Sequence, residues 1–281
     1  MVVLDNKILH VEIAEMGAEI RKVLHNGKDC VWSGDPKVWN GVAPILFPIC
    51  SRLRDGKYTY EGKEYFMGIH GFAKTQIAEV ESATSYSATF LFKDTPETLE
   101  LYPWHFELRV TYLLKGSSID VFYDVKNTSE NTMYYSIGSH ESYALEGSAE
   151  DYDVIFEREE TLYAYEIEKG GLKYTRNIIL KDSKVLPIYE KYFEVDALIF
   201  KDVKSRFVTL RNRKTGESAS VEFNGFDYLL LWHKQGAPYM CIEPWAGMCQ
   251  TSDSDYDITT KEGILTLEPG EKSRFKHSLF Y

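Results

Sequence analysis

The sequence predicts an all-β protein, a large antiparallel β-sandwich. Tyr (20 residues) and Phe (15 residues) are plentiful in the 281-residue chain, and such side chains favour strands. Short strand-like runs with turn signals between them recur along the whole chain, whereas helical patterns are scarce. No linker, repeat or low-complexity tract divides the sequence, so we expect a single domain over residues 1–281.

Alternating apolar residues and Gly- or Ser-containing turns indicate where the strands lie. We predict strands at residues 7–12, 77–81, 87–93, 106–114, 119–126, 134–145, 153–156, 161–167, 207–211, 218–223, 228–232, 239–243, 263–267 and 274–280. The clearest hairpin joins 106–114 to 119–126 through Lys115-Gly-Ser-Ser118. One or two helical turns are expected at Met16–Val23 and at Thr95–Leu101, the second ended by Pro103.

Composition limits the partners that the protein can have. The hydrophobic fraction of 44% allows a sizeable core, and the net charge of −11 disfavours nucleic acid and anionic membrane surfaces. Four cysteines without CxxC spacing, and a start without a signal-peptide pattern, indicate a cytoplasmic protein with free thiols. A small neutral molecule remains a suitable partner, and we expect a monomer or homodimer.

The stretch Tyr239-Met-Cys-Ile-Glu-Pro-Trp245 carries the strongest candidate for chemistry. As a strand ended by Pro244, it places Tyr239, Cys241 and Glu243 on one face and its apolar residues on the other. A carboxylate held at a rigid strand end, with Tyr239 and Trp245 as walls, is suited to be the general base for a polyol. The alternative is an exposed glutamate at a sheet edge, and for Cys241 a small core residue.

Two histidines have glycine neighbours that leave the imidazole accessible. His70 lies in Gly68-Ile-His-Gly-Phe72, and His140 lies in Gly138-Ser-His-Glu-Ser142 near the middle of a predicted strand. Gly138 on the same face predicts a depression beside His140. Each histidine could instead bind a backbone carbonyl, but two of them in a chain that offers Glu243 favour a site.

Arginine and aspartate provide candidate groups for binding hydroxyls. In an extended segment, alternation places Arg52 and Arg54 on one face, where a guanidinium suits vicinal hydroxyls or phosphate. The alternative is a solvated turn in which Asp55 pairs with them. Asp196 precedes an apolar run and is either a ligand or a turn former. No dinucleotide fingerprint, P-loop or nucleophile elbow is present.

Taken together, these motifs resemble the aldose 1-epimerase (galactose mutarotase-like) family, and most closely its LacX-type branch. They occur in the family's order over nearly the whole chain. The matching segments are Gly17-Ala-Glu-Ile20, Trp39, Ala43-Pro-Ile-Leu-Phe-Pro48, Arg52, Asp55-Gly-Lys-Tyr58, His70-Gly-Phe72, Gly138-Ser-His140, Asp196-Ala-Leu-Ile-Phe200 and Cys241-Ile-Glu-Pro-Trp-Ala-Gly247.

The resemblance implies a supersandwich fold with a sugar site on an open face. It implies that Glu243 is the general base and His140 the general acid, and that His70, Arg52 and Asp196 bind the sugar. Two positions depart from the family pattern, because Glu141 stands where proline usually follows the second histidine and Lys74 stands where arginine is common. The first departure adds a charge beside the expected acid.

The reaction implied is interconversion of α and β anomers of a hexose by acid–base ring opening and closure, which requires neither metal nor cofactor. A hexose 6-phosphate is an alternative substrate, since Arg52, Arg54, Lys57 and Lys74 offer a basic rim. The candidate site residues are also compatible with three other functions. The protein could bind sugar without catalysis, or be a glycosidase that uses Glu243 and Asp196. His70, His140 and Glu243 could instead form an iron site.

Overall fold

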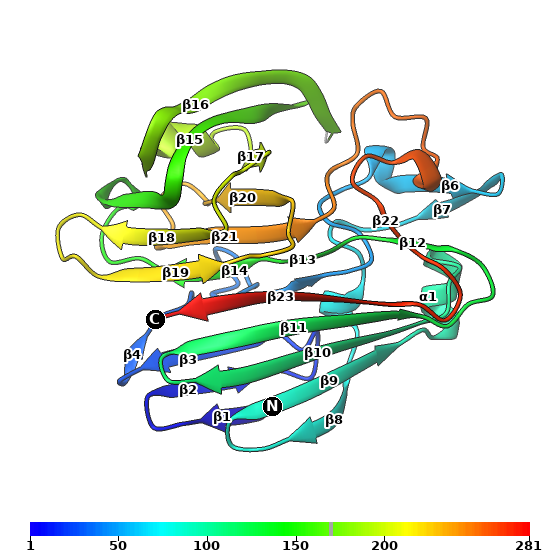
Figure 1. The fold of residues 1–281 in the computed structure, drawn as a ribbon, viewed down its shortest axis with the longest axis horizontal. Helices are drawn as coiled ribbons and strands as arrows, with labels where there is room; N and C mark the ends of the chain where they lie inside the picture. Colours follow the sequence, from blue (N-terminus) through cyan, green and yellow to red (C-terminus); the bar gives the residue numbers. More distant parts are fainter. Residues whose placement is uncertain (169–170) are drawn as a thin grey trace.

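A computed structural model describes residues 1–168 and 171–281, and it confirms the predicted all-β class. A large antiparallel sheet curves through most of the molecule, and a separate four-stranded sheet packs against one part of it. Figure 1 shows the two parts of this arrangement, with β1–β4 beside β8–β11 in its lower half and β15–β21 above them. Among the described residues, no helix has the length and apolar character needed to cross a membrane.

The large sheet follows one continuous path from β5 to β8, with two further strands paired to its members. In path order its strands are β5 (Ile45–Leu46), β13 (Ile137–Ser139), β21 (Tyr239–Ala246), β20 (Tyr228–Trp232), β17 (Leu198–Lys201), β15 (Tyr152–Glu168), β18 (Phe207–Asn212), β19 (Ser218–Glu222), β23 (Lys272–Phe280), β11 (Ser118–Asn127), β10 (Phe106–Lys115), β9 (Ser87–Lys93) and β8 (Glu79–Ala83). Off the path, β14 (Glu141–Ala144) pairs with β21 and β16 (Gly171–Pro187) pairs with β15.

The remaining elements are short. The four-stranded sheet contains β1 (Val2–Asp5), β2 (Leu9–Ile13), β3 (Ile20–His25) and β4 (Lys28–Asp29). Two-stranded pairs are formed by β6 (Lys57–Tyr60) with β7 (Lys63–Phe66), and by β12 (Met133–Tyr135) with β22 (Leu265–Leu267). The helix α1 (Pro96–Leu101) is capped by Thr95, whose side chain accepts from the Thr98 N–H. This helix is the one that the sequence predicts at 95–101.

The core forms where apolar faces of the two sheets meet. In β10 every second side chain is buried, and its partner β11 pairs with it in an unbroken antiparallel register, as the predicted hairpin requires. Tyr112 of β10 reaches across to the N-terminal sheet, where its hydroxyl donates to the Ala18 carbonyl over 2.7 Å. Ala18 lies in the connection between β2 and β3, so this buried hydrogen bond links β10 to one end of the N-terminal sheet.

Several predicted elements differ from the structure. The segment 16–23 does not hold helical turns, because its second half is the strand β3, whose apolar residues pack into the core. The strand predicted at 7–12 starts at Leu9, since Lys7 adopts a positive φ in the turn after β1. The strands predicted at 153–156 and 161–167 are one element, β15, with irregular register.

The strand β16 is absent from the sequence prediction. It runs from Gly171 to Pro187 and pairs with β15, and most of its side chains are partly or fully exposed. A strand with little burial lacks the apolar alternation by which a half-buried strand is recognised. Figure 1 shows the β15–β16 hairpin arching over the end of the molecule that carries β17–β21.

The strand predicted at 134–145 is divided, and the division positions the site. It consists of β12, β13 and β14, with a break in the ladder at His140. Gly138 pairs with Trp245 and Glu141 pairs with Ile242 on β21. The same register, continued through the break, places His140 opposite Glu243 and Ser139 opposite Pro244.

Pro244 explains this local geometry. The prediction that it ends the strand is wrong, because β21 continues to Ala246 and Pro244 pairs with Leu229 of β20. A proline has no N–H to donate to a neighbouring strand, so a ladder beside it can open locally without losing a hydrogen bond. The break between β13 and β14 lies beside Pro244, and it leaves His140 at the edge of a cavity.

Candidate active site

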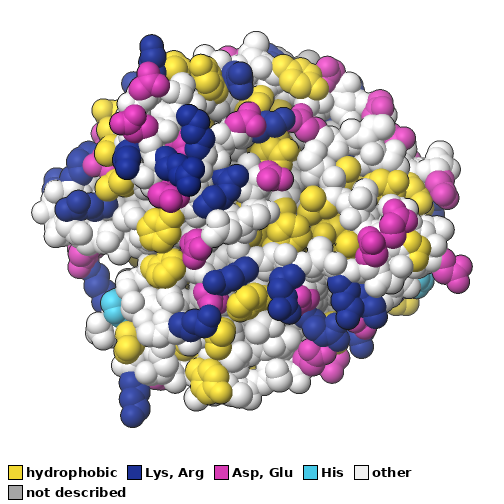
Figure 2. All heavy atoms as spheres, viewed as in Figure 1, with side chains coloured by type: hydrophobic (Ala, Val, Ile, Leu, Met, Phe, Trp, Pro, Cys, Tyr) yellow, Lys and Arg dark blue, Asp and Glu magenta, His cyan; other side chains and the backbone are white. Residues whose placement is uncertain are grey.

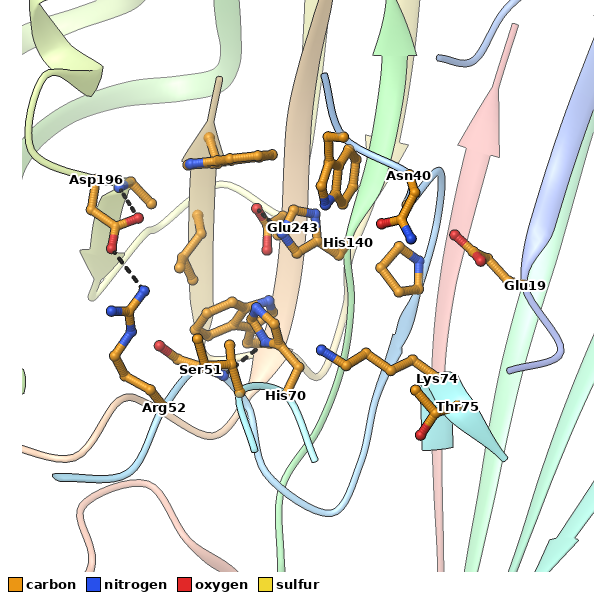
Figure 3. Close-up of a pocket in the computed structure, with 18 of the residues that line it drawn as sticks. Glu19, Asn40, Ser51, Arg52, His70, Lys74, Thr75, His140, Asp196 and Glu243 are labelled. Carbon is orange, nitrogen blue, oxygen red and sulfur yellow. Dashed lines mark hydrogen bonds and ion pairs between the residues drawn. The ribbon is translucent and has the colours of Figure 1, made fainter. Parts of the chain in front are cut away.

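A cavity of about 860 Å³ opens between β21, β20 and the segments that follow β5. All five predicted site residues line it: Arg52, His70, His140, Asp196 and Glu243. Figure 3 shows Glu243 and His140 at its centre, the Arg52–Asp196 pair on one side and Lys74 with Glu19 on the other. The volume is within the range of small-molecule sites, about 300–1,000 Å³.

Glu243 projects from β21 into the cavity and is almost completely buried, with 1% of its surface exposed. The alternation expected for this strand is confirmed, because Met240 and Ile242 belong to the main core on its other face. Burial raises the pKa of the Glu243 carboxyl well above its ordinary value, and the negative charges of Glu141 and Asp196 add to the effect. Within the described chain, its Oε2 atom has no hydrogen-bond partner.

His140 is the cross-strand neighbour of Glu243, and its Nε2 lies 3.4 Å from Oε1 of the carboxylate. Its ring packs against Trp39 and Trp232, with ring centroids 5.0 and 5.5 Å away. Burial among these rings lowers the pKa of His140 to about 4. The other ring nitrogen, Nδ1, is buried and has no partner among the described residues.

His70 is held by two hydrogen bonds with Ser51, one in each direction. The Ser51 N–H donates to Nδ1 of His70 over 3.0 Å, and the His70 N–H donates to the Ser51 carbonyl. Because Nδ1 accepts, the proton of the neutral ring lies on Nε2, which can therefore act as a donor. Burial lowers the pKa of His70 well below its usual range, and the His140, Lys74 and Arg52 charges act in the same direction.

Only one of the two glycines that flank His70 has the predicted role of close backbone approach. A Cβ at Gly71 would lie 2.3 Å from the Phe47 carbonyl oxygen, and Gly71 has a φ of +68°. Nothing lies within 4 Å of a Cβ built at Gly68. Gly71 therefore lets the chain pass close to the backbone of Phe47 and Pro48, which follow β5, and this close approach brings His70 to the cavity.

Arg52 and Asp196 form an ion pair at the cavity wall, with Nη2 3.3 Å from Oδ2. The other carboxylate oxygen of Asp196 accepts from the Ala197 N–H. Arg54 does not share this position, contrary to the expectation that both arginines occupy one face. It starts a 3₁₀ turn, donates to the Ser254 carbonyl and lies over the Tyr256 ring.

Further side chains line the cavity without a predicted role in binding a neutral sugar, among them Trp39, Trp232 and Lys74. Trp39 belongs to a matched family segment, but Trp232 gives no signal beyond its place at a strand end, where it pairs with Cys241. Burial lowers the pKa of the Lys74 ammonium. Its contact with the cavity depends on a turn, Ala73–Thr75, that sequence periodicity does not reveal.

Two expected features of the cavity are wrong. Tyr239 is not among the described residues that line it, because that residue lies further along β21 and packs beneath Trp39, 5.4 Å away between ring centroids. Gly138 does not leave a hollow beside His140, because the Trp245 ring fills the space and would be 2.8 Å from an added Cβ. Both results place Trp245, and not Tyr239, at the wall.

Glu141 does not approach the cavity. Its carboxylate is on the core side, where Oε1 accepts from His277 Nε2 over 2.9 Å and Oε2 accepts from the Ser139 hydroxyl over 2.6 Å. The departure from the family pattern at this position therefore adds a charge that is satisfied inside the core. The ion pair and hydrogen bonds keep the pKa of Glu141 low despite its burial.

The potential metal ligands that lie close together are not the three residues considered for iron, which are His70, His140 and Glu243. Among the described residues, the histidine, cysteine and carboxylate groups that lie close enough are His140, Cys241 and Glu243, with ligand atoms within 4.8 Å of one another. His70 does not belong to this group, and the Ser51 N–H occupies its Nδ1.

Comparison with known proteins identifies the family. The sequence model of the family described as aldose 1-epimerase matches residues 1–279. The chain belongs to the aldose 1-epimerase family. The plasmid-encoded protein LacX of Lactococcus lactis subsp. lactis is 33% identical over 291 residues, which cover 98% of this chain and 97% of that protein. This match confirms the resemblance to the LacX-type branch.

Solved structures agree with this assignment. A galactose mutarotase related enzyme from Lactobacillus acidophilus superimposes with a TM-score of 0.95 at 32% identity, covering 99% of this chain and 96% of that one. A galactose mutarotase-like protein from Lactobacillus casei gives a TM-score of 0.91 at 27% identity, covering 100% and 99%. The protein is accordingly an isomerase of the aldose 1-epimerase (mutarotase) class with the galactose mutarotase-like fold.

Proposed function

We propose that this aldose 1-epimerase interconverts the α and β anomers of an unphosphorylated hexose, with Glu243 as general base and His140 as general acid. The observation that carries the proposal is the Glu243–His140 contact of 3.4 Å at the centre of the cavity. Anomerisation requires a proton to leave the C1 hydroxyl and another to reach the ring oxygen. Both oxygens are bonded to C1, so two adjacent side chains can serve them.

The pKa shifts support a pair that holds a single proton. Burial raises the pKa of Glu243 and lowers that of His140 to about 4, so above about pH 4 and below the raised pKa of Glu243 the pair carries one proton. With the proton on His140, the carboxylate accepts the C1 hydroxyl proton while the imidazolium protonates the ring oxygen. The open-chain aldehyde then faces a protonated Glu243 and a neutral His140.

Ring closure reverses these transfers on the other face of the aldehyde. After rotation about the C1–C2 bond, Glu243 returns its proton to the carbonyl oxygen and His140 accepts the proton of the attacking hydroxyl. The pair ends with the protonation that it had at the start, so each turnover needs no proton from solvent. Burial favours the tautomer with the proton on Glu243, so that proton must move to His140 before ring opening, and burial then favours its return to Glu243 as the aldehyde forms.

The remaining cavity residues would bind and orient the sugar. His70 is fixed with its Nε2 proton available, so it can donate to a sugar oxygen and stabilise the developing carbonyl. The Arg52–Asp196 pair offers further guanidinium donors and carboxylate acceptors for hydroxyls at the opposite side of the cavity. The Trp39, Trp232 and Trp245 rings supply apolar walls.

Charge balance in the cavity supports a neutral hexose over a hexose 6-phosphate. Of the four basic residues considered for a phosphate, Arg52 is paired with Asp196, Arg54 donates to Ser254, and Lys57 pairs with Glu64 over 2.6 Å. Lys74 is the one that lines the cavity without an ion pair among the described residues. One ammonium is a weak phosphate site when compared with forked arginine donors.

Polarimetry tests the proposal directly. Freshly dissolved α-glucose or α-galactose should reach its equilibrium rotation faster with the enzyme, and kcat/KM should be higher for glucose than for glucose 6-phosphate. A sugar-binding protein without catalytic function would leave the rate of rotation unchanged. A preference for the phosphate ester would instead make the neutral-hexose assignment wrong.

We also propose that the enzyme acts in the cytoplasm. The described cysteines, Cys30, Cys50, Cys241 and Cys249, are free thiols, which supports action in the reducing cytoplasm. On the face of the molecule in Figure 2, basic and acidic side chains are intermixed, so that face offers no extended positive surface for a polyanion. We expect a monomer or homodimer, which light scattering after size exclusion would distinguish.

A further inference from the structure

Cys241 is a fully buried thiol close to His140 and Glu243 that the proposed reaction does not use. It precedes Glu243 by two positions on β21, so both side chains leave the same face of the strand. Its sulfur, a ring nitrogen of His140 and a carboxylate oxygen of Glu243 all lie within 4.8 Å of one another. Three different metal-binding groups therefore converge on one point.

The geometry resembles that of a partly assembled transition-metal site. The His140 Nε2 to Glu243 Oε1 distance is 3.4 Å, longer than a strong hydrogen bond between these groups. Zinc bond lengths of ~2.0–2.3 Å and tetrahedral angles place ligand atoms roughly 3.4–3.6 Å apart. The histidine and glutamate are already at that separation, and the thiol sulfur lies within 4.8 Å of both ligand atoms.

A second observation points to a missing partner. Glu243 Oε2, on the carboxylate that would bind the ion, is buried without a hydrogen-bond partner in the described chain. Buried polar atoms are normally satisfied, and unsatisfied ones occur where a ligand or ion binds. The cavity side of the carboxylate leaves room for water as a fourth ligand, the arrangement found in zinc sites with three protein ligands.

We propose that His140, Cys241 and Glu243 form a binding site for a thiophilic divalent cation such as Zn²⁺, and that the bound ion inhibits the enzyme. Thiolate and imidazole ligands select zinc-like ions over Mg²⁺ and Ca²⁺, which prefer oxygen ligands. Binding releases the Cys241 thiol proton and the single proton of the Glu243–His140 pair to solvent. The metal then occupies both proposed proton carriers and excludes the sugar.

The binding part of this proposal stands on the three side chains alone, whereas the inhibition rests on the proposed function. Cobalt(II) is the most direct probe, because thiolate coordination gives a charge-transfer absorption in the near ultraviolet. We expect one bound Co²⁺ or Zn²⁺ per wild-type chain after dialysis, together with this absorption. Cys241→Ala should lose both, with at least about a 100-fold weaker affinity, since even loss of an outer partner of a metal site costs ~10–100-fold.

A matched control uses a different buried thiol, Cys249. Cys249 lines the cavity, but its sulfur donates to the Ser51 hydroxyl. Cys249→Ala should therefore retain the cobalt absorption. If Cys241→Ala does not fold, as judged by circular dichroism, Cys241→Ser is the second variant, because a hydroxyl cannot produce the thiolate absorption.

Activity measurements complete the test. Zn²⁺ should raise the apparent KM of wild-type enzyme, EDTA should restore it, and Cys241→Ala should turn over in metal-free buffer with little sensitivity to zinc. Equal zinc sensitivity in wild type and Cys241→Ala, or the absence of bound metal, would overturn the proposal. A cobalt absorption in a protein without mutarotase activity would keep the metal site and reject the proposed function.

Discussion

Two buried glutamate–histidine pairs in this protein have their glutamates on adjacent strands, and the pairs face opposite sides of the sheet. The cavity pair is Glu243 with His140, 3.4 Å apart. The core pair is Glu141 with His277, 2.9 Å apart and stacked on Tyr123. Because Glu141 pairs with Ile242, the two glutamates are separated by one residue position of the ladder, and strand alternation alone sends them to different environments.

The two carboxylates differ in how completely they are bonded. Both oxygens of Glu141 accept hydrogen bonds, from His277 and from Ser139, whereas Oε2 of Glu243 has no partner within the described chain. The pKa of Glu141 is correspondingly lowered and that of Glu243 is raised, although both groups are fully buried. The comparison teaches that burial alone does not decide the direction in which the pKa of a carboxylate moves, because hydrogen-bond and charge partners can outweigh it.

Removing the charge of the cavity pair should have the largest effect. Glu243→Gln keeps the shape of the side chain but cannot accept the C1 hydroxyl proton, so kcat should fall by ~10²–10⁴-fold. Sugar binding should change little, because the amide still fits the cavity. Polarimetry measures the rate and calorimetry measures the sugar affinity. Near-normal kcat in this variant would show that Glu243 is not the base.

Removing the histidine of the core pair should affect stability instead. His277→Ala leaves the Glu141 carboxylate buried with only the Ser139 hydroxyl, and breaking a buried pair in this way costs about 3–5 kcal/mol. Urea denaturation measures the loss, and kcat per folded molecule should stay close to that of wild type. The control is His105→Ala, which removes an exposed histidine 2.7 Å from Asp94 and should cost at most about 1 kcal/mol.

The pH profile should report the cavity pair through two limbs. Below about pH 4 His140 and Glu243 together hold two protons, so no base remains and kcat/KM should fall ~10-fold per pH unit. Above the raised pKa of Glu243 the pair loses its single proton, so no acid remains. A bell-shaped profile is therefore expected, measured by polarimetry against the buffer-catalysed rate. An acid limb near pH 6.5, the ordinary pKa of histidine, would mean that burial does not control His140.

The smallest effect is expected when the charge of the core pair alone is removed. Glu141→Gln retains an oxygen for the Ser139 or His277 donor, so the free energy of unfolding at neutral pH should fall by only about 1 kcal/mol. Both limbs of the pH profile should move to lower pH, because the Glu141 charge raises the pKa of His140 and of Glu243. Unchanged limbs would show that the two pairs are electrostatically independent.

The same variant tests the linkage between pH and stability. The folded-state pKa of Glu141 lies below its unfolded value, so the wild type gains stability from this group above the unfolded pKa and loses it as pH falls. Glu141→Gln should lack this contribution. Its stability should therefore decline less steeply than that of the wild type on acidification, as measured by urea denaturation at each pH.

Parts of the fold followed from local pattern and others did not. The hairpin of β10 and β11 was predicted because ten-residue strands with alternating burial flank a short Gly-containing turn. The strand β16 was missed because its side chains are mostly exposed, so its pairing with β15 leaves no apolar alternation in the sequence. The sequence does not show that Pro244 lies inside a strand. β21 accommodates this proline because the neighbouring ladder is interrupted between β13 and β14.

The sequence by itself determined which chemical groups this protein has available: a glutamate on a strand, two glycine-flanked histidines, an arginine and an aspartate in the order of a known family. It also determined the all-β class, because strand periodicity and turn residues are local properties. Only the tertiary structure decided that His140 lies opposite Glu243, that Trp39, Trp232 and Lys74 join them, and that Glu141 is turned into the core. Strand register sets these placements, and register is fixed by pairing between segments about one hundred residues apart.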